Sequence, residues 1–206
     1  MYKVLIVEDD PMARQLLEIY VRESGRYELV PSLASAALAE FCCRTHHVDL
    51  ILMDICTAMN ASGLVVAEKV KKYFPHIRIV MITSQPECSF LDRARAANVD
   101  SFWYKSATAS ELLFVMDRTM AGECVYPAST PRLQIGYAFS DSFSARELEV
   151  LRELVSGETD AVIAERLHLS LRTVKSHIQS LLNKTGLRNR TELAVRARES
   201  GLIIIN

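Results

Sequence analysis

The sequence has no hydrophobic run that approaches the roughly 20 residues of a membrane-spanning helix. Its first residues, MYKVLIVEDD, also lack the layout of a signal peptide. We therefore expect a cytoplasmic protein that has no membrane partner. CxxC spacing is absent and the number of cysteines is odd, so we expect reduced thiols rather than disulfides. The five cysteines are Cys42, Cys43, Cys56, Cys88 and Cys124.

A strong net charge is also absent, because the 206 residues carry a formal net charge of −1. Half of the residues are hydrophobic and 24% are charged, which is typical of a folded globular protein of one or two domains. The charge is unevenly distributed, however. Residues 166–198 contain eight basic residues and one acid, a local charge of +7, which leaves −8 for the rest of the chain. This distribution predicts a polyanionic partner for the C-terminal part.

Short hydrophobic segments alternate with amphipathic segments through the first 121 residues. The segment 48–53 is apolar except for Asp49, as expected of a strand buried on both faces of a parallel sheet. The predicted strands are residues 3–7, 27–30, 48–53, 76–82 and 100–104. The predicted helices begin at Pro11, with Asp10 as N-cap, and continue with residues 34–45, 64–73, 86–98 (opened by Pro86) and 108–121. This alternation predicts a doubly wound α/β fold with a five-stranded parallel sheet.

A second, all-helical part follows a predicted linker over residues 122–139, which contains two prolines and two glycines. Ser144 and Glu147 form a capping box for a helix that ends at Gly157. The other predicted helices are residues 159–167, a helix capped by Ser170 that ends near residue 185, and residues 191–200. Two helices joined by a very short turn, the second with a basic face, predict a helix-turn-helix.

Polar residues follow four of the five predicted strands. They are Glu8 and Asp9, Asp54, Thr83 and Lys105. Because the carboxyl ends of parallel strands meet at one edge of a sheet, we expect these side chains to converge. Three converging carboxylates favour a bound cation, and Mg²⁺ prefers such hard oxygen ligands. A carboxylate can also accept a phosphoryl group, whose charge a hydroxyl and a cation would stabilise.

These residues resemble the receiver domain of bacterial two-component response regulators, a flavodoxin-like (βα)5 fold. The match rests on the VEDD run at Glu8 and Asp9, on Asp54, on Thr83-Ser84, and on Lys105 after FWY. The resemblance implies that Asp54 is the phosphoacceptor and that Thr83 and Lys105 bind the phosphoryl oxygens. It assigns Mg²⁺ to Glu8, Asp9, Asp54 and the Cys56 backbone carbonyl, and it makes Phe102 the switch aromatic that works with Thr83.

The loop after Asp54 departs from the receiver pattern. Receivers usually read D-x-x-M-P-G-M-x-G there, whereas this chain lacks the proline and places Gly63 nine residues after Asp54. The departure concerns the geometry of the loop and leaves the other receiver residues in place. Cys56 and Gln85 flank the expected path of a hydrolytic water, and neither is an obvious acid or base. We therefore predict a phosphorylated state that lasts minutes or longer.

Two other readings of the first part are less well supported. A haloacid-dehalogenase-type phosphatase would also use a strand-end Asp, but it would need a second Asp at the position of Cys56. The CCRTHH run places Cys42 and His46 four residues apart, a spacing that can bind a metal. No further ligand follows nearby, so we interpret that run as helix packing and surface.

The third helix of the second part has one apolar and one polar face. Val174, Ile178 and Leu181 recur at helical spacing and should face the core. The opposite face carries Arg172, Lys175, Ser176, Gln179 and Asn183. Such side chains can read base edges in a major groove. The flanking residues Lys184, Arg188 and Arg190 suit phosphates, which fix position rather than sequence.

Residues 144–203 resemble the LuxR/NarL-type helix-turn-helix domain along their whole length. The resemblance makes residues 171–184 the recognition helix, with Lys175, Ser176 and Gln179 toward the bases. It places Thr173, His177 and the basic group Lys184, Arg188 and Arg190 nearer the DNA backbone. The helix over residues 191–200 is where such domains pair on DNA.

Together the two resemblances predict a receiver domain (1–121), a linker (122–139) and a DNA-binding domain (140–206). The expected protein is a signalling transcription factor and not an enzyme, apart from self-phosphorylation by small donors and self-dephosphorylation. Its expected partners are a sensor histidine kinase, double-stranded promoter DNA, a second copy of the chain and RNA polymerase. The altered loop motivates one alternative, a regulator that works without phosphorylation and uses its receiver as a dimerisation module.

Overall fold

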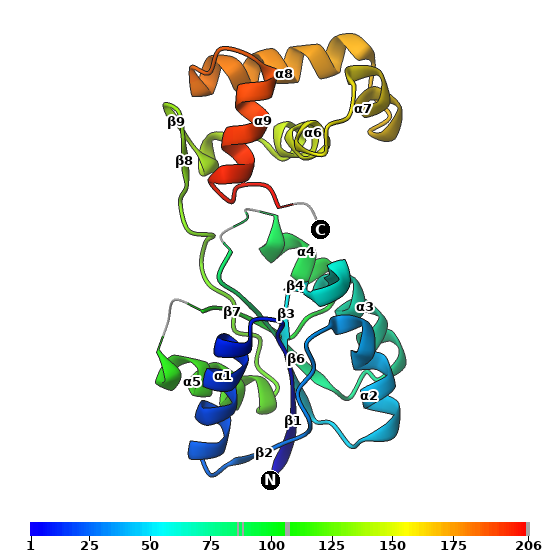
Figure 1. The fold of residues 1–206 in the computed structure, drawn as a ribbon, viewed down its shortest axis with the longest axis vertical. Helices are drawn as coiled ribbons and strands as arrows, with labels where there is room; N and C mark the ends of the chain where they lie inside the picture. The colour runs from blue at the N-terminus through cyan, green and yellow to red at the C-terminus, as the bar shows by residue number, and fades with distance from the viewer. Residues whose placement is uncertain (86, 88, 106–107, 205–206) are drawn as a thin grey trace. The chain divides into compact units, whose positions relative to one another are not determined.

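The computed structural model describes residues 1–85, 87, 89–105 and 108–204 (Figure 1). The predicted helix start at Pro86 and the cysteine Cys88 lie outside the described residues. Residues 1–85 and 89–129 form a first compact unit, and residues 130–204 lie in a second. None of the described helices is both long and apolar enough to cross a membrane.

The first unit is built on the predicted parallel sheet. Its five strands lie in the order β2-β1-β3-β6-β7, and every neighbouring pair is parallel. The strands are β1 (Tyr2–Val7), β2 (Tyr27–Leu29), β3 (Leu50–Asp54), β6 (Arg78–Thr83) and β7 (Ser101–Tyr104). All five residues of β3 are buried, because this apolar strand lies at the centre of the sheet and is covered on both faces. The doubly wound α/β fold is confirmed.

Helices cover both faces of this sheet. The helices are α1 (Pro11–Glu23), α2 (Ala39–Thr45), α3 (Gly63–Tyr73), α4 (Phe90–Ala96) and α5 (Ala109–Met120). In Figure 1, α1 and α5 lie on one side of the sheet and α2, α3 and α4 on the other. Asp10 caps α1 as predicted, since its carboxylate accepts hydrogen bonds from the N–H groups of Met12 and Ala13 at 2.8 and 3.0 Å.

The bounds of several predicted elements differ from those observed. The helix predicted over residues 34–45 is a 3-10 turn, η1 (Ala36–Leu38), followed by α2. Ser35 holds the start of this segment away from helical geometry, because its hydroxyl donates to the Ala58 carbonyl at 2.8 Å. The helix predicted over residues 86–98 is described as α4 from Phe90 to Ala96, and β2 ends one residue early, at Leu29.

The loop after β3 is a small ordered structure. It consists of β4 (Cys56–Thr57), a 3-10 turn η2 (Ala58–Asn60) and β5 (Ala61–Ser62), and β4 and β5 pair antiparallel. The Thr57 hydroxyl fixes this ladder by donating to the Ala61 carbonyl at 2.7 Å and accepting from the Ala36 N–H at 2.9 Å. The loop is therefore attached to the sheet edge rather than freely extended.

The backbone of this loop has two unusual features. Met59 and Asn60 both adopt left-handed backbone angles, with φ of 66° and 53°. Gly63 then returns the chain to the site, where its N–H donates to the Ile55 carbonyl at 2.8 Å. A Cβ atom on Gly63 would lie 1.9 Å from the backbone oxygen of Asp54. Glycine is thus required by a close approach of two backbones.

The first residues of the predicted linker belong to the first unit. We call residues 122–126 the edge segment, because they lie along β7 at the edge of the sheet. The Phe102 N–H donates to the Val125 carbonyl at 2.8 Å, and the Val125 N–H donates to the Ser101 hydroxyl at 3.0 Å. The Tyr126 ring lies 6.2 Å from the Phe102 ring, and its hydroxyl donates to the Val99 carbonyl at 2.8 Å.

The second unit contains the four predicted helices and a hairpin that the sequence did not indicate. Its elements are β8 (Gln134–Ile135), β9 (Ala138–Phe139), the 3-10 turn η3 (Ser140–Ser142), α6 (Ala145–Val155), α7 (Asp160–Arg166), α8 (Leu171–Thr185) and α9 (Arg190–Glu199). Ile135 and Ala138 are buried in the same core as Leu151 and Val174. Residues 130–139 therefore fold with the helices, although we predicted them as linker.

Glu147 ties α6 to α8. Besides its predicted capping-box bond to the Ser144 N–H at 2.7 Å, its carboxylate accepts hydrogen bonds from Ser180 and Lys184, both at 2.7 Å. Burial alone would raise the pKa of Glu147, but the bonds from Lys184, Ser144 and Ser180 outweigh it and lower the pKa to about 2. The ionised carboxylate is thus part of the packing between these helices.

The close approach at Gly63 generates a first prediction. Gly63→Ala should lower the free energy of unfolding by about 1–3 kcal/mol, because the new methyl group must displace either the loop or the backbone of Asp54. Lys69→Ala, on the exposed face of α3, should change it by less than about 0.5 kcal/mol. Denaturant unfolding of the full chain measures both. A Gly63→Ala variant as stable as the wild type would contradict the close approach.

The depressed pKa of Glu147 generates a second prediction. Because the folded-state pKa of about 2 lies below the ordinary value of 4.5, ionised Glu147 stabilises the fold above pH 4.5. That contribution should disappear as the pH falls from 4.5 toward 2. Glu147→Gln should therefore destabilise the second unit at neutral pH and flatten this part of the stability profile. An unchanged acid profile, measured by thermal unfolding, would contradict the assignment.

Candidate functional site

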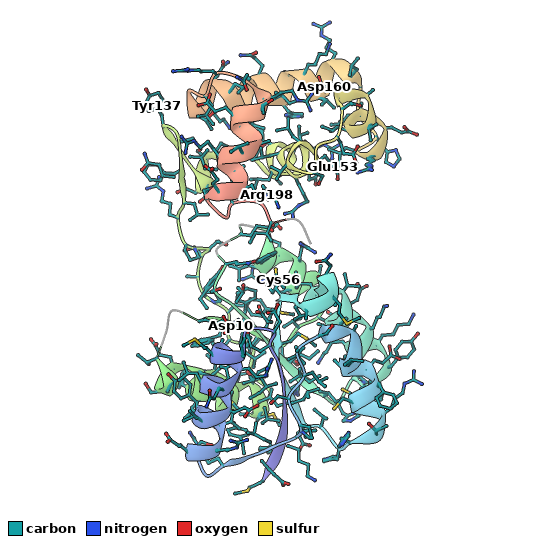
Figure 2. All side chains as sticks on the ribbon, in the orientation of Figure 1. Asp10, Cys56, Tyr137, Glu153, Asp160 and Arg198 are labelled. Carbon is teal, nitrogen blue, oxygen red and sulfur yellow. The ribbon has the colours of Figure 1, made fainter. Side chains whose placement is uncertain are left out.

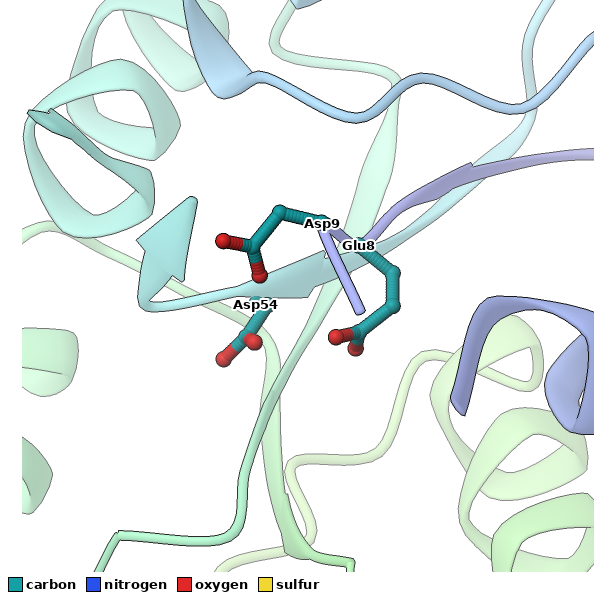
Figure 3. Close-up of side chains that lie close together, drawn as sticks. All are labelled: Glu8, Asp9 and Asp54. Carbon is teal, nitrogen blue, oxygen red and sulfur yellow. The ribbon is translucent and has the colours of Figure 1, made fainter. Parts of the chain in front are cut away.

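Three carboxylates gather at the carboxyl ends of β1 and β3. Glu8 and Asp9 directly follow β1, and Asp54 is the last residue of β3. One oxygen from each carboxylate lies within 4.8 Å of the others. Figure 3 shows the three side chains close together. Glu8 and Asp54 are buried, whereas Asp9 is exposed. The sequence prediction that these acids converge is correct.

Lys105 is the cation of this cluster. It follows β7, and its N–H donates to the Thr83 carbonyl at 2.9 Å, which fixes the backbone beside β6. Its ammonium nitrogen lies 2.5 Å from Glu8 Oε2 and 2.8 Å from Asp54 Oδ2. Two carboxylates buried this closely would repel each other, so the ammonium that joins them is required electrostatically.

The ionisation of these groups reflects their burial. Burial, together with the nearby charge of Asp54, raises the pKa of Glu8 to about 7, although Lys105 opposes the shift. Burial also raises the pKa of Asp54 above its usual value, against the effect of Lys105. Burial by itself would lower the pKa of Lys105, but the two carboxylates raise it, so the lysine is charged. One ammonium does not fully compensate three acids, which favours binding of a further cation.

The carboxylate cluster fits Mg²⁺. Among the described residues, Glu8, Asp9 and Asp54 are the group of three His, Cys, Asp or Glu side chains close enough to share an ion. All three offer hard oxygen atoms, and the exposure of Asp9 leaves room for metal-bound water. The Cys56 backbone carbonyl, assigned to the metal by resemblance, stays a prediction. The described cysteines Cys42, Cys43, Cys56 and Cys124 carry thiols rather than disulfides.

Thr83 is the last residue of β6, the strand next to β3, and Phe102 lies on β7, the strand beyond β6. The buried Thr83 hydroxyl accepts a hydrogen bond from the Gln85 N–H at 3.0 Å, so its own hydrogen can be donated to a ligand. The Cys56 thiol donates to Gln85 Oε1 at 3.1 Å. Phe102 is buried and packs edge-on against Tyr104 at 5.2 Å, with Tyr126 of the edge segment on its other side.

The predicted DNA-reading side chains lie together on α8. Val174, Ile178 and Leu181 are buried in the core of the second unit. The side chains left exposed on the opposite face are Arg172, Lys175, Ser176, Gln179 and Asn183. Thr173 and His177 are half-buried at the border of this face. The Thr173 N–H donates to the Ser170 hydroxyl at 3.0 Å, which confirms Ser170 as the N-cap of α8.

Two of the three predicted phosphate-binding residues have partners inside the domain. Lys184 bonds to Glu147 and also donates to the Ser142 carbonyl at 2.9 Å. Arg190 pairs with Asp160 at 2.5 Å and donates to the Glu158 carbonyl at 2.7 Å, which joins the start of α9 to α7. Their contact with DNA stays a prediction, and the structure gives them packing roles that the sequence did not indicate. Arg188 is exposed.

Comparison with known families agrees with both halves of this description. Residues 4–117 match the family "Response regulator receiver domain", and residues 141–197 match "Bacterial regulatory proteins, luxR family". The response regulator protein VraR of Staphylococcus saprophyticus is 30% identical over 206 residues, and the alignment covers 98% of each chain. VraR of Staphylococcus aureus is 29% identical over 208 residues, again with 98% of each chain covered.

Solved structures share the fold at lower identity. The RcsB response regulator of Salmonella typhimurium aligns with a TM-score of 0.63 and 18% identity, over 95% of this chain and 98% of that one. The response regulator ChrA, from a heme-sensing two-component system, aligns with a TM-score of 0.52 and 21% identity, over 98% of each chain. Both family models and the VraR relatives point to the same class. The chain belongs to the LuxR/NarL family of two-component response regulators, DNA-binding proteins that regulate transcription.

Proposed function

We propose that a partner histidine kinase phosphorylates Asp54, with Mg²⁺ bound, and that phosphorylation switches dimerisation and transcriptional control. The observation that carries this proposal is the ammonium of Lys105 at 2.8 Å from Asp54 Oδ2, beside the carboxylates of Glu8 and Asp9. A cation held next to a buried strand-end carboxylate is positioned to neutralise a phosphoryl group on that carboxylate. In this proposal the protein acts in the cytoplasm, and its partners are the kinase, promoter DNA, a second copy and RNA polymerase.

The transfer is a displacement at phosphorus. An oxygen of the Asp54 carboxylate attacks the phosphorus atom, and the bond to the donor breaks, so the donor leaves with the electron pair. The donor is a phosphohistidine of the kinase or a small acyl phosphate. Lys105 neutralises charge on the phosphoryl oxygens, and the Thr83 hydroxyl donates to one of them. Mg²⁺, held by Glu8, Asp9 and Asp54, would supply further charge neutralisation.

Phe102 offers a route from the phosphorylated site to the rest of the chain. Thr83 would move toward the phosphoryl group, and the buried Phe102 would follow into the space that Thr83 leaves. Because Tyr126 packs against Phe102 and the Phe102 N–H is bonded to Val125, such a movement acts directly on the edge segment. The edge segment begins the connection to the second unit. A change at Asp54 would thereby alter the start of the linker.

The phosphoacceptor assignment predicts a specific covalent change. Incubation with acetyl phosphate or phosphoramidate should add one phosphoryl group to the full chain when Mg²⁺ is present, as measured by intact mass. Asp54→Ala should abolish the gain, and Asp92→Ala, which removes an exposed carboxylate on α4, should leave it unchanged. If neither small donors nor a kinase produced the gain, the phosphorylation-independent alternative would replace this proposal.

The environment of Asp54 predicts a long-lived phosphorylated state. Cys56 and Gln85 bond to each other beside the site, and neither can readily take a proton from water. We expect a half-life of minutes or longer at room temperature, and we expect Gln85→Glu to shorten it about 10-fold or more by supplying a base. Loss of the phosphoryl group can be followed by intact mass. A wild-type half-life of seconds would contradict the prediction.

The exposed face of α8 predicts how DNA binding responds to substitution. The test uses a duplex that the wild type selects from a random pool. Lys175→Ala should weaken binding to this duplex by about 1–3 kcal/mol of binding free energy, and it should relax specificity at one base pair. Arg188→Ala should weaken all duplexes alike and reduce the slope of log affinity against log salt by about 1. Lys72→Ala, on α3 of the first unit, is the charge-matched control. Equal effects of all three variants would contradict the assignment.

A further inference from the structure

The β8–β9 hairpin has a tip that the family assignment does not explain. Gln134 pairs with Phe139 and Ile135 with Ala138, so Gly136 and Tyr137 form the turn. Ile135 and Ala138 anchor the hairpin in the core of the second unit. Tyr137, in contrast, has 85% of its surface exposed and is labelled at the tip in Figure 2. A rigid anchor thus presents an aromatic ring to solvent.

The hairpin is bonded to the C-terminal end of α8, the predicted recognition helix. The Tyr137 N–H donates to the Thr185 carbonyl at 2.9 Å, one of the carbonyls that a helix end leaves without an intrahelical partner. Gly136 adopts a φ of +57°, and a Cβ atom there would lie 2.0 Å from the same carbonyl oxygen. The hairpin turn therefore reaches α8 at backbone distance, which only glycine permits at this position.

A second glycine, Gly186, fixes the position of the Tyr137 ring. Gly186 ends α8 in the left-handed conformation, with a φ of 70°. A Cβ atom on Gly186 would lie 2.4 Å from Cδ2 of Tyr137, so the ring rests directly on the backbone of Gly186. Scattered exposed aromatic residues are common on protein surfaces and need no explanation. Here, however, two glycines and a backbone hydrogen bond hold the ring at the end of one particular helix.

The surroundings of Tyr137 indicate the chemistry of its partner. The exposed face of α8 carries Arg172 and Lys175, and Arg188 follows two residues after Gly186. Two acids lie near the end of this face: Glu147 is buried and paired with Lys184, and the Glu192 carboxylate accepts a hydrogen bond from the Arg188 N–H at 2.8 Å. α8 itself contains no acid, so the charge on its exposed face is positive, which suits a polyanion. A tyrosine hydroxyl beside such a face commonly donates to a DNA phosphate oxygen.

We propose that Tyr137 is a further DNA-binding residue, whose hydroxyl donates to a backbone phosphate next to the groove that α8 reads. This inference rests on the proposed binding of DNA by the exposed face of α8. The contact is independent of sequence, because it is made to phosphate rather than to a base. The hairpin fixes the direction of the Tyr137 ring. The contact therefore also sets how far the C-terminal end of α8 enters the groove.

The test compares Tyr137→Phe and Tyr137→Ala with the wild type as full chains. The probes are the duplex selected by the wild type and an unrelated duplex of equal length, with affinity measured by fluorescence anisotropy over a salt series. Tyr137→Phe should bind both duplexes about 2- to 10-fold more weakly, as expected for loss of one hydrogen bond. The salt slope should not change, because no charge is lost. Tyr73→Phe, an exposed tyrosine of α3, should bind like the wild type.

The outcomes separate this inference from the proposed function. Tyr137→Phe removes only the hydroxyl, and an unchanged melting temperature would show that its weaker binding is not a folding defect. Wild-type affinity of Tyr137→Phe would overturn the phosphate contact, whatever Tyr137→Ala shows. A wild-type chain that binds no duplex would overturn the DNA-binding function and this inference with it. Weaker binding of the selected duplex alone would also overturn it, because a phosphate contact affects every sequence.

Discussion

The ion pairs of Lys105 with Glu8 and Asp54 are the interaction on which the receiver half depends. Two buried carboxylates at the ends of β1 and β3 are costly unless a cation joins them, and Lys105 reaches them from the end of β7. The lysine therefore couples three strands of the sheet through charge as well as through backbone pairing. It also places an ammonium beside Asp54, so in the proposed function phosphorylation would replace the ion pair that stabilises the site.

Strand β7 connects the carboxylate cluster with the edge segment at the end of the first unit. Lys105 follows β7, and β7 carries Phe102, whose ring packs on Tyr126 and whose N–H bonds to Val125. The edge segment thus covers the last strand of the sheet, which would otherwise expose unpaired backbone groups. In the second unit the β8–β9 hairpin bonds to the end of α8, the proposed recognition helix. Both ends of the connection are therefore attached to elements of the proposed sites.

The features that the sequence predicted are those set by local patterns. Apolar runs located the strands, and cap residues such as Asp10, Ser144 and Ser170 located helix starts within a residue. The convergence of the acids was predictable because the carboxyl ends of parallel strands meet at one edge of a sheet. The edge segment and the partners of Lys184 could not be predicted, because each depends on contacts between distant residues. The hairpin was missed because its strands are two residues long, too short to show an alternating pattern. The extra loop residue was visible in the sequence, but the left-handed backbone at Met59 and Asn60 was not.

A crystal structure of the full chain grown with Mg²⁺ and beryllofluoride would test the central claim most directly. The account predicts beryllofluoride on an oxygen of Asp54 and a cation among the carboxylates of Glu8, Asp9 and Asp54. It also predicts that the Lys105 ammonium leaves Asp54 for a fluorine atom and that Thr83 donates to another. An unmodified Asp54 still bonded to Lys105, with both ligands in excess, would contradict it.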